Sequence, residues 1–376
     1  MKTLITLILF LLLLPICVEA AEPPMPKGER IRSIIAEKYP KGNVYVGGST
    51  GWRRRPSGSG VIVDREFSYI TPDNDYKQSA IHPSPGVWKW DVADAWVEHC
   101  AKNGQTLRLH GPGSPQCSRW AKDDSRTPEE LKKNFVEYIT ALCKRYDKYE
   151  HVKWIDVVNE TVMNKGEWHT FREGNDRWEC PWTKMGFDES HPLKPPLYIK
   201  MAFEIANKHA PNTKLIINQH AEMEEPMWEK VKALVPYLRG KGLRVDGIGW
   251  QGHVNVGWEK DPDNMKKLHA LIDWAHSNKL SFHITEMNAW FRGKGMQSKE
   301  IDLDAQAKTY AALFGALLEH RENGIVTWNV WGISDANAWM QEKKWEGCTF
   351  DREYRAKPAH YAIQKLLENP PPPRKK

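Results

Sequence analysis

The sequence predicts the α/β fold class, with the whole domain a single (β/α)8 TIM barrel. Eight short, apolar, β-branched runs are typical of buried strands, and helical patterns lie between nearly all of them. This alternation indicates βαβ units around a parallel sheet, and eight units in one domain favour a closed barrel. An open, doubly wound sheet is the rival fold, but no glycine-rich phosphate motif follows the first strand.

The strands are predicted where runs of β-branched and aromatic residues stop at charged or turn-forming residues. The connection between the first two of them, Gly51–Asp64, has no clear helical pattern and is expected to be irregular. The predicted strands are Asn43–Ser49, Phe67–Thr71, Thr106–His110, Val152–Glu160, Lys214–Asn218, Gly247–His253, Ser281–Glu286 and Val326–Ser334.

The helices are predicted from apolar periodicity and from their start and stop signals. The segment Thr127-Pro128-Glu129-Glu130 combines a cap, a first-turn proline and acidic first-turn residues, so it opens a helix that runs to Tyr146. Asn103-Gly104 is a stop signal for an earlier helix. The remaining predicted helices are Asp91–Asn103, Leu197–His209, Pro226–Arg239, Asp263–Ser277, Leu303–Glu322 and Pro358–Leu367.

The connections after the fourth and eighth strands, 161–195 and 336–355, are long and rich in tryptophan. Long loops in a compact domain are usually functional or disordered, and their tryptophans argue against disorder. Aromatic side chains commonly line ligand sites, where their flat faces stack on sugar rings. These loops are therefore candidates for the walls of a binding site.

The first residues of the chain are expected to be a targeting signal. The apolar run Leu4–Ile16 follows a positive start, and Val18-Glu19-Ala20 offers small residues at a cleavage point. We therefore predict a secretory signal peptide over residues 1–20, because the run is too short to span a membrane. Residues 21–368 are expected to form one barrel domain, and 369–376 a frayed, proline-rich basic tail. The mature protein is expected to be secreted, periplasmic or on the cell surface, with no membrane segment.

Composition excludes several other classes of protein. The net charge of +6 comes from lysines and arginines spread along the chain, so we expect no nucleic-acid partner. Five cysteines follow position 20 without metal-ligand spacing, and their odd number leaves at least one thiol unpaired within the chain. We expect a monomer.

Two of the predicted strands end in the same way, at a glutamate. Lys153–Glu160 and Ser281–Glu286 are both apolar, β-branched runs that stop at a carboxylate. Burying a charge is costly unless the charge has a task. In a barrel the active site lies at the carboxyl ends of the strands, so these two groups could face each other there. Such a pair of carboxylates is the equipment of a retaining glycosidase.

Five motifs in order along the chain resemble those of one family, glycoside hydrolase family 10, the retaining endo-β-1,4-xylanases. The resemblance covers about Ile31 to Leu367. The matching segments are Thr71–Lys77 (T-P-E-N-E-M-K), Ile155–Glu160 (W-D-V-V-N-E), Gly247–His253 (G-I-G-x-Q-x-H), Ile284–Asn288 (I-T-E-L-D) and Trp331–Asp335 with Trp339 (W-G-x-x-D and a later Trp).

This resemblance implies that Glu160 is the general acid/base and Glu286 the nucleophile. For its role Glu160 must be protonated near neutral pH, so we expect burial and nearby negative charge to raise its pKa. Glu286 must stay ionised, and His253 could hold it by a hydrogen bond. From the residues alone, both glutamates could instead be ordinary ion-paired carboxylates.

The resemblance also implies a set of residues that bind the substrate, with Asn159 on the 2-hydroxyl of the reacting sugar. From the residues alone, Lys77 could be a surface lysine, His253 a satisfied buried histidine and Trp331 a core residue. No metal or other cofactor is expected, because acid and nucleophile are both side chains. The expected substrate-binding residues are Asn74, Lys77, His110, Asn159, Gln251, His253, Trp331 and Trp339.

The chain departs from the family pattern around these residues. Ser114 and Pro115 stand where the family usually has Trp and His, and Asp73 replaces a Glu. The usual N-D-Y-N becomes Asn218-Gln219-His220-Ala221, and Asn288 replaces an acid beside the nucleophile. Both catalytic carboxylates are retained, so we expect an active enzyme with reshaped subsites.

Three functions follow from these observations. The first is a secreted retaining hydrolase of the β-1,4-xylan backbone, a polysaccharide substrate. The second is a retaining hydrolase of another β-glycan, acidic or decorated, which the run Arg53-Arg54-Arg55 with Arg172 and Arg177 favours. The third is a non-catalytic carbohydrate-binding barrel, because folds outlive their chemistry.

Overall fold

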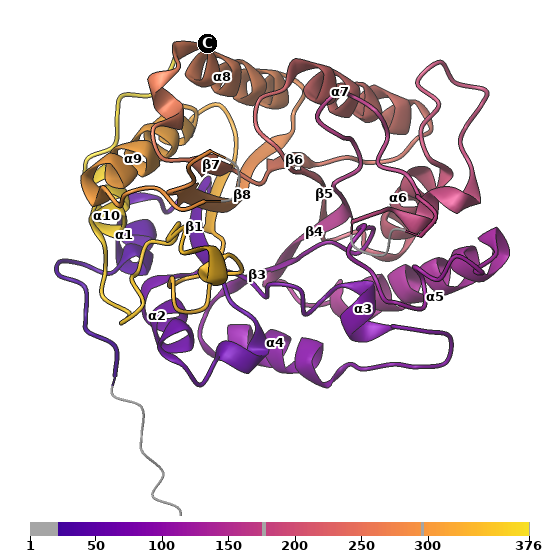
Figure 1. The fold of residues 1–376 in the computed structure, drawn as a ribbon, viewed down its shortest axis with the longest axis horizontal. Coiled ribbons are helices and arrows are strands. Elements are labelled where there is room, and N and C mark those ends of the chain that lie inside the picture. Colours follow the sequence, from indigo (N-terminus) through magenta and orange to yellow (C-terminus); the bar gives the residue numbers. More distant parts are fainter. Residues whose placement is uncertain (1–21, 175–177, 295–296, 376) are drawn as a thin grey trace, which may run out of the picture.

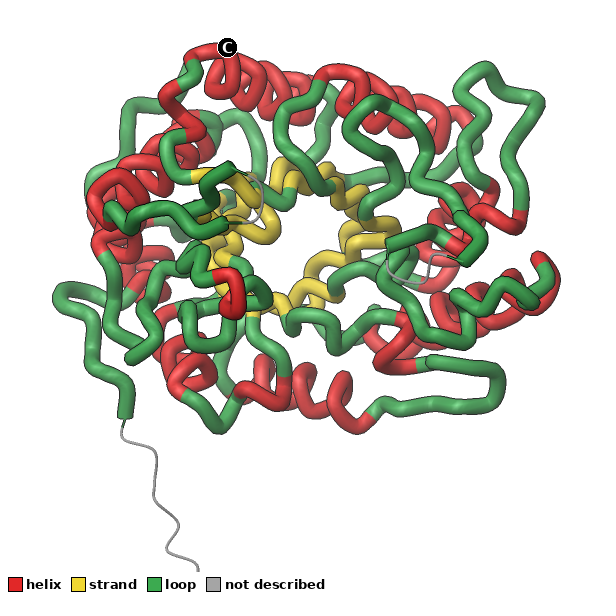
Figure 2. Tube along the Cα trace, in the orientation of Figure 1, coloured by secondary structure: helices red, strands yellow, loops and turns green. Residues whose placement is uncertain are grey.

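A computed structural model describes residues 22–174, 178–294 and 297–375. It confirms the predicted fold class: parallel strands close into a ring, and helices surround that ring (Figures 1 and 2). The residues of the expected signal peptide, 1–20, lie outside the described residues. Within the described part of the chain, no helix is long and apolar enough to cross a membrane.

Eight strands form the barrel in chain order, and pairing of β6 with β8 and of β9 with β1 closes it. Among the described residues one further short strand, β7, pairs with the carboxyl-terminal part of β8, Asn288–Trp290. The strands are β1 Val44–Ser49, β2 Tyr69–Thr71, β3 Thr106–Leu109, β4 Val152–Asn159, β5 Lys214–Gln219, β6 Gly247–Trp250, β7 His253–Asn255, β8 Ser281–Trp290 and β9 Val326–Val330.

The seven predicted helices agree with α4 to α10 to within a few residues at each end, whereas α1, α2 and α3 were not predicted. The helices are α1 Ile31–Lys38, α2 Gly58–Glu66, α3 Gln78–Ile81, α4 Asp91–Lys102, α5 Pro128–Tyr146, α6 Leu197–His209, α7 Glu225–Gly240, α8 Pro262–Ser277, α9 Leu303–Glu319 and α10 Pro358–Glu368. The predicted cap is present, because the Thr127 hydroxyl accepts from the Glu130 N–H while the Glu130 carboxylate accepts from the Thr127 N–H.

Two predictions about local structure are wrong. The connection Gly51–Asp64 is not wholly irregular, because α2 begins within it, capped by the Ser57 hydroxyl. The predicted strand Gly247–His253 is divided into β6 and β7. Gly252 between them has φ 77°, a left-handed conformation that ends a strand and that glycine adopts without strain.

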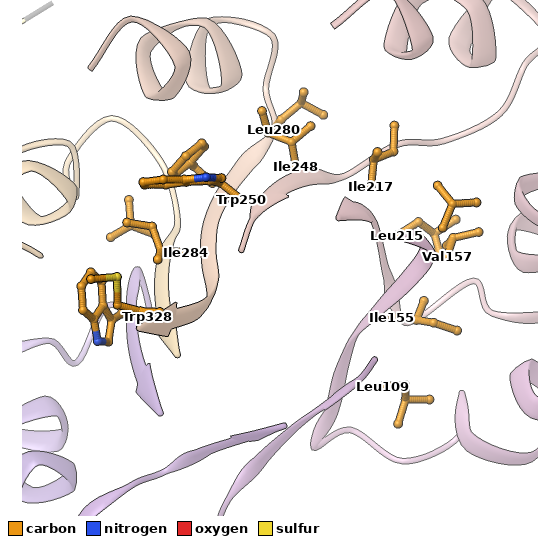
Figure 3. Close-up of a cluster of buried hydrophobic side chains, with 14 of the residues drawn as sticks. Leu109, Ile155, Val157, Leu215, Ile217, Ile248, Trp250, Leu280, Ile284 and Trp328 are labelled. Atoms are coloured by element: carbon orange, nitrogen blue, oxygen red, sulfur yellow. The ribbon is translucent and has the colours of Figure 1, made fainter. Parts of the chain in front are cut away.

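Successive side chains of each strand point alternately into the barrel and out toward the helices, and the outward apolar ones pack against the helices. Leu109, Ile155, Ile217 and the other labelled residues of Figure 3 point outward from the ring toward the helices. Inside the ring, Tyr69, Trp154 and Ile216 pack together. This packing fixes the strands, so their carboxyl ends present side chains at one rim.

Candidate active site

A cavity of about 630 Å³ opens where the barrel strands end. It brings together eight of the ten expected site residues, which come from loops and strand ends far apart in the chain. These eight residues are Asn74, Lys77, Glu160, Gln251, His253, Glu286, Trp331 and Trp339. The other two, His110 and Asn159, are buried and contact residues that line the cavity.

Glu160 follows the last residue of β4 and is held there by its backbone. Its φ of 57° is left-handed, which is unusual for a residue with a side chain. The Glu160 N–H donates to the carbonyl of Asn218 (3.1 Å), and the next two N–H groups donate to the amide oxygen of Gln219 (3.2 and 3.4 Å). The strained turn therefore aims the carboxylate at the cavity.

The two oxygens of the Glu160 carboxylate each accept a hydrogen bond from a side chain. Gln251 Nε2 donates to Oε1 at 2.9 Å, and Trp178 Nε1 donates to Oε2 at 2.7 Å. Burial alone would raise the pKa of Glu160, but the charges of His220 and Lys77 and these two hydrogen bonds lower it below its ordinary value. The expectation of a raised pKa is therefore wrong for the site without substrate.

Glu286 lies within β8 and is surrounded by donors. Asn218 Nδ2 donates to its Oε1 at 2.9 Å, His253 Nε2 lies 3.5 Å from Oε2, and His110 Nε2 lies 3.8 Å from Oε1. Burial would raise the pKa of Glu286, but His110 and His253 lower it to about 2. This carboxylate is therefore ionised across the neutral range, as a nucleophile requires.

An amide network joins the two carboxylates through Asn159. The Asn159 Oδ1 accepts from Asn218 Nδ2 (2.9 Å), which also bonds Glu286. The same oxygen accepts from Gln251 Nε2 (3.3 Å), which also bonds Glu160. Each carboxylate is thus one amide group away from the same oxygen, which keeps the two on one side of the barrel rim.

His110 is positioned from below by a buried acid. Its Nδ1 lies 2.8 Å from Asp156 Oδ2, and Asp156 in turn lies 3.5 Å from the guanidinium of Arg108. All three side chains are buried. The arrangement orients the other ring nitrogen of His110 toward Glu286.

Burial and contacts show where Lys77, His253 and the two tryptophans lie relative to the cavity. Lys77 is only 2% exposed and lines the cavity, so it is not a surface lysine; burial lowers its pKa, while Glu160 and Glu286 oppose that shift. His253 stacks on Trp290 at 5.0 Å and contacts Glu286. Trp331 is nearly buried but lines the cavity, whereas Trp339 stands 53% exposed at its rim.

Several lining residues were not predicted as site residues, and three of them, Gln116, Trp178 and His220, bear on the catalytic groups. The side chain of Gln116 accepts a hydrogen bond from Lys77. Trp178 belongs to the tryptophan-rich loop after β4, and His220 to the altered motif after β5, so both lay within flagged segments. The sequence did not show that these two loops bring Trp178 and His220 close to Glu160.

The arginines that favoured an acidic substrate do not gather at one place. Arg54 lines the cavity and pairs with Asp73 at 3.2 Å. Arg55 pairs with Asp64 at 2.8 Å, and Arg172 donates to the carbonyl of Trp178 at 2.6 Å. Arg177 lies outside the described residues. Of the arginines named for that hypothesis, Arg54 is the described one that faces the cavity.

A family model, curated proteins and solved structures that are similar to this chain all come from one family. The family model described as glycosyl hydrolase family 10 matches residues 37–366. Endo-1,4-beta-xylanase A of Caldicellulosiruptor saccharolyticus is 32% identical over 321 residues, which are 80% of this chain and 87% of that protein. An endo-1,4-beta-xylanase/feruloyl esterase of Xylanibacter ruminicola is 28% identical over 79% of this chain, which spans only 42% of that longer protein. The crystal structure of native xylanase 10B from Thermotoga maritima superimposes with a TM-score of 0.75 and 27% identity, over 90% of this chain and 98% of that one.

Proposed function

Because the chain belongs to glycosyl hydrolase family 10 and is a glycoside hydrolase, we propose that it hydrolyses the β-1,4-xylan backbone with retention of configuration. Glu160 is the acid/base and Glu286 the nucleophile. The observation that supports this most is the placement of both carboxylates on one cavity, joined by the amides of Asn218, Asn159 and Gln251.

The proposed reaction has two displacements. In the first, an oxygen of Glu286 attacks the anomeric carbon while the proton of Glu160 passes to the departing glycosidic oxygen, leaving a glycosyl ester on Glu286. In the second, the Glu160 carboxylate takes a proton from water, the water oxygen attacks the same carbon, and the ester bond breaks. Both side chains return to their starting forms.

Other groups hold the sugar chain in this proposal. Asn74 and Lys77 bind hydroxyls beyond the reacting ring, and Trp331 and Trp339 form its walls. Asn159 Nδ2 makes only a long bond of 3.4 Å to the Ser114 hydroxyl, so it can exchange that bond for the 2-hydroxyl of the reacting sugar.

Export of the enzyme is also part of the proposal. Residues 1–20 have the charge and apolar pattern of a signal peptide, and a polymeric substrate is met outside the cell. Mature protein recovered from the culture medium with an N-terminus after residue 20 supports export. Full-length protein retained with the cells contradicts it.

Release of reducing ends from xylan tests the function. E286Q is expected to abolish release, because no nucleophile remains. E160A is expected to lose about 10²–10⁴-fold on xylan yet keep slow action on aryl xylosides with good leaving groups, whose departure needs little proton transfer. E66Q is the control, because Glu66 is also buried but lies on α2, outside the lining of the cavity.

The outcomes separate the alternatives. Unchanged turnover in E286Q contradicts the catalytic pair. If wild-type protein releases nothing from xylan but cleaves another β-glycan, the mechanism stands and the substrate is wrong. A rate that falls when the acidic groups of a substrate are reduced favours the acidic or decorated β-glycan, and binding without turnover by wild type favours a carbohydrate-binding barrel.

A further inference from the structure

Trp178 occupies one oxygen of the proposed acid/base. Its indole N–H donates to Glu160 Oε2 at 2.7 Å, while Gln251 occupies Oε1 at 2.9 Å. A general acid must present a protonated oxygen to the leaving group. In the free site, therefore, the indole N–H occupies one lone-pair site of Oε2 and favours the form of that oxygen without a proton.

The position of Trp178 is built by the loop that follows β4. The two ring nitrogens of His169 lie 3.0 Å from the carbonyl oxygen of Glu160 and 3.1 Å from that of Trp178, so the imidazole lies between the two residues, and its N–H donates to one of these carbonyls. The His169 ring also meets the indole edge to face, with centroids 4.5 Å apart. Arg172 donates to the Trp178 carbonyl as well.

The indole is also held from the neighbouring strand end. The His220 ring, after β5, meets Trp178 at 5.0 Å and 84°. The next loop indole along the chain, Trp182, donates to the carbonyl of Ser114 at 2.9 Å. The segment that follows Trp178 is thus held against Ser114, which follows β3.

Charged groups around Glu160 come from several elements. Lys77 follows β2, His169 lies in the loop after β4, His220 follows β5, and Glu286 lies on β8. Glu224, before α7, acts on His220. Lys77 and His220 favour the ionised form of Glu160 through charge, and Trp178 and Gln251 favour it through hydrogen bonds. Trp178 differs from the two charged groups in acting without a charge of its own.

We propose that Trp178 is a positioning residue for the acid/base, holding Glu160 Oε2 in the ionised form between turnovers and yielding that oxygen to the leaving group when substrate binds. This inference rests on the proposed function. The indole favours the second displacement, in which Glu160 must accept a proton from water, and opposes the first, in which it must donate one. No bond to carbon is made or broken by Trp178.

The test is the pH dependence of W178F, which removes the N–H donor and keeps an aromatic ring. The basic limb of kcat/KM on a xylo-oligosaccharide reports the acid in the free enzyme, and it is expected to move up by roughly half to one pH unit. With an aryl xyloside that has a good leaving group, the acidic limb of kcat reports the base, and it is expected to move up as well.

The matched control is W168F. Trp168 lies in the same loop, and its N–H donates to the carbonyl of Leu193 rather than to a carboxylate (3.2 Å). The basic limb of kcat/KM and the acidic limb of kcat in W168F are expected to lie at the same pH as in wild type. Unmoved limbs in W178F, or equal shifts in both variants, overturn the proposal, because a stacking or purely structural role for Trp178 changes rates without moving the limbs.

Two further variants, H169L and E160A, test the proposal where W178F cannot. If W178F does not fold, H169L removes the imidazole that lies between Trp178 and Glu160, and its basic limb is expected to shift in the same direction by less; an unmoved limb there overturns the proposal. The failure of the proposed function is seen separately, in an E160A variant that cleaves xylan as fast as wild type.

Discussion

At the residue scale, the proposed acid/base depends on a clamp made by one neutral side chain. Gln219 is fully buried, and its amide oxygen accepts from the N–H groups of Thr161 and Val162, while its amide nitrogen donates to the Val162 carbonyl at 2.6 Å. These bonds satisfy the backbone next to Glu160, whose φ is positive. A buried backbone group without a partner is costly, so this side chain stabilises the strained turn.

We therefore predict that Q219A lowers the free energy of unfolding by about 1–3 kcal/mol and lowers kcat with little change in KM, because Glu160 loses its orientation. Urea unfolding and steady-state kinetics on xylan measure the two effects. The control is Q105A, since Gln105 is equally buried and donates to the carbonyls of Val63 and Phe67, away from the cavity. Q105A should lose stability alone. A Q219A enzyme with wild-type kcat contradicts the clamp.

Residues on strands and those on loops differed in how far the sequence could place them. Glu160 and Glu286 were predicted at one rim because parallel strands of a barrel all end there, and both line the cavity. Trp178 could not be placed, since the contact with Glu160 depends on the path of a loop held by His169 and Arg172. The net direction of the pKa shift of Glu160 was also missed, because it depends on the charges of His220 and Lys77 and on hydrogen bonds from Gln251 and Trp178, four residues from separate segments of the chain.

At the element scale, the segment 331–350 after β9 is fixed from beneath by one buried lysine. Lys357 Nζ lies 2.6 Å from Asp335 Oδ2 and donates to the carbonyls of Glu346 (2.8 Å) and Cys348 (2.9 Å). Lys357 and Asp335 are nearly inaccessible to solvent. Burial raises the pKa of Asp335, and the Lys357 charge opposes that shift. The segment carries Trp331 and Trp339, so this lysine supports one wall of the cavity.

K357M is expected to destabilise the protein by about 3 kcal/mol, because the variant leaves the Asp335 carboxylate buried without its cation. It is also expected to raise KM for xylan more than it lowers kcat, since the segment with Trp339 loosens while Glu160 and Glu286 stay in place. The control K41M removes the ion pair with Glu322, whose two side chains are 72% and 44% exposed. That variant should unfold as wild type does. Equal stability of K357M and wild type contradicts this role.

Helices with clear capping residues or apolar periodicity were predicted to within a few residues, whereas some short elements were missed. α5 and α6 lie where capping and periodicity placed them. α2 was missed because Gly58–Glu66 contains two glycines and only a short apolar stripe, and the Ser57 cap was overlooked. β7 could not be separated from β6 by composition, because the break depends on the left-handed backbone of Gly252.

At the scale of the whole molecule, the barrel gathers charged groups that would not be buried singly. Arg108 and Asp156 share the interior with His110, and this column reaches Glu286. The alternation of strands and helices was sufficient to predict closure, because each strand must be covered by a helix and eight such units complete a ring. The interior column was not predicted, since Arg108 and Asp156 lie on separate strands.

Because this column stabilises the ionised form of Glu286, the free energy of unfolding is expected to depend on pH. The folded pKa of Glu286 is about 2, below its ordinary value of 4.5. A depressed carboxyl pKa contributes stability that is complete above the unfolded pKa and is lost as pH falls through the folded pKa. For this shift the contribution is on the order of 3 kcal/mol, of which about 2 kcal/mol is lost between pH 6 and pH 3.

We therefore predict that E286Q has a flatter pH dependence than wild type: its free energy of unfolding in urea should fall about 2 kcal/mol less between pH 6 and pH 3. The reference variant is E37Q, which makes the same substitution at an exposed position of α1 and should keep the wild-type slope. Parallel curves for E286Q and wild type would mean that His110, His253 and Asn218 do not stabilise the ionised form of Glu286 in the fold. The same curves would then remove the electrostatic reason for assigning the nucleophile to that residue.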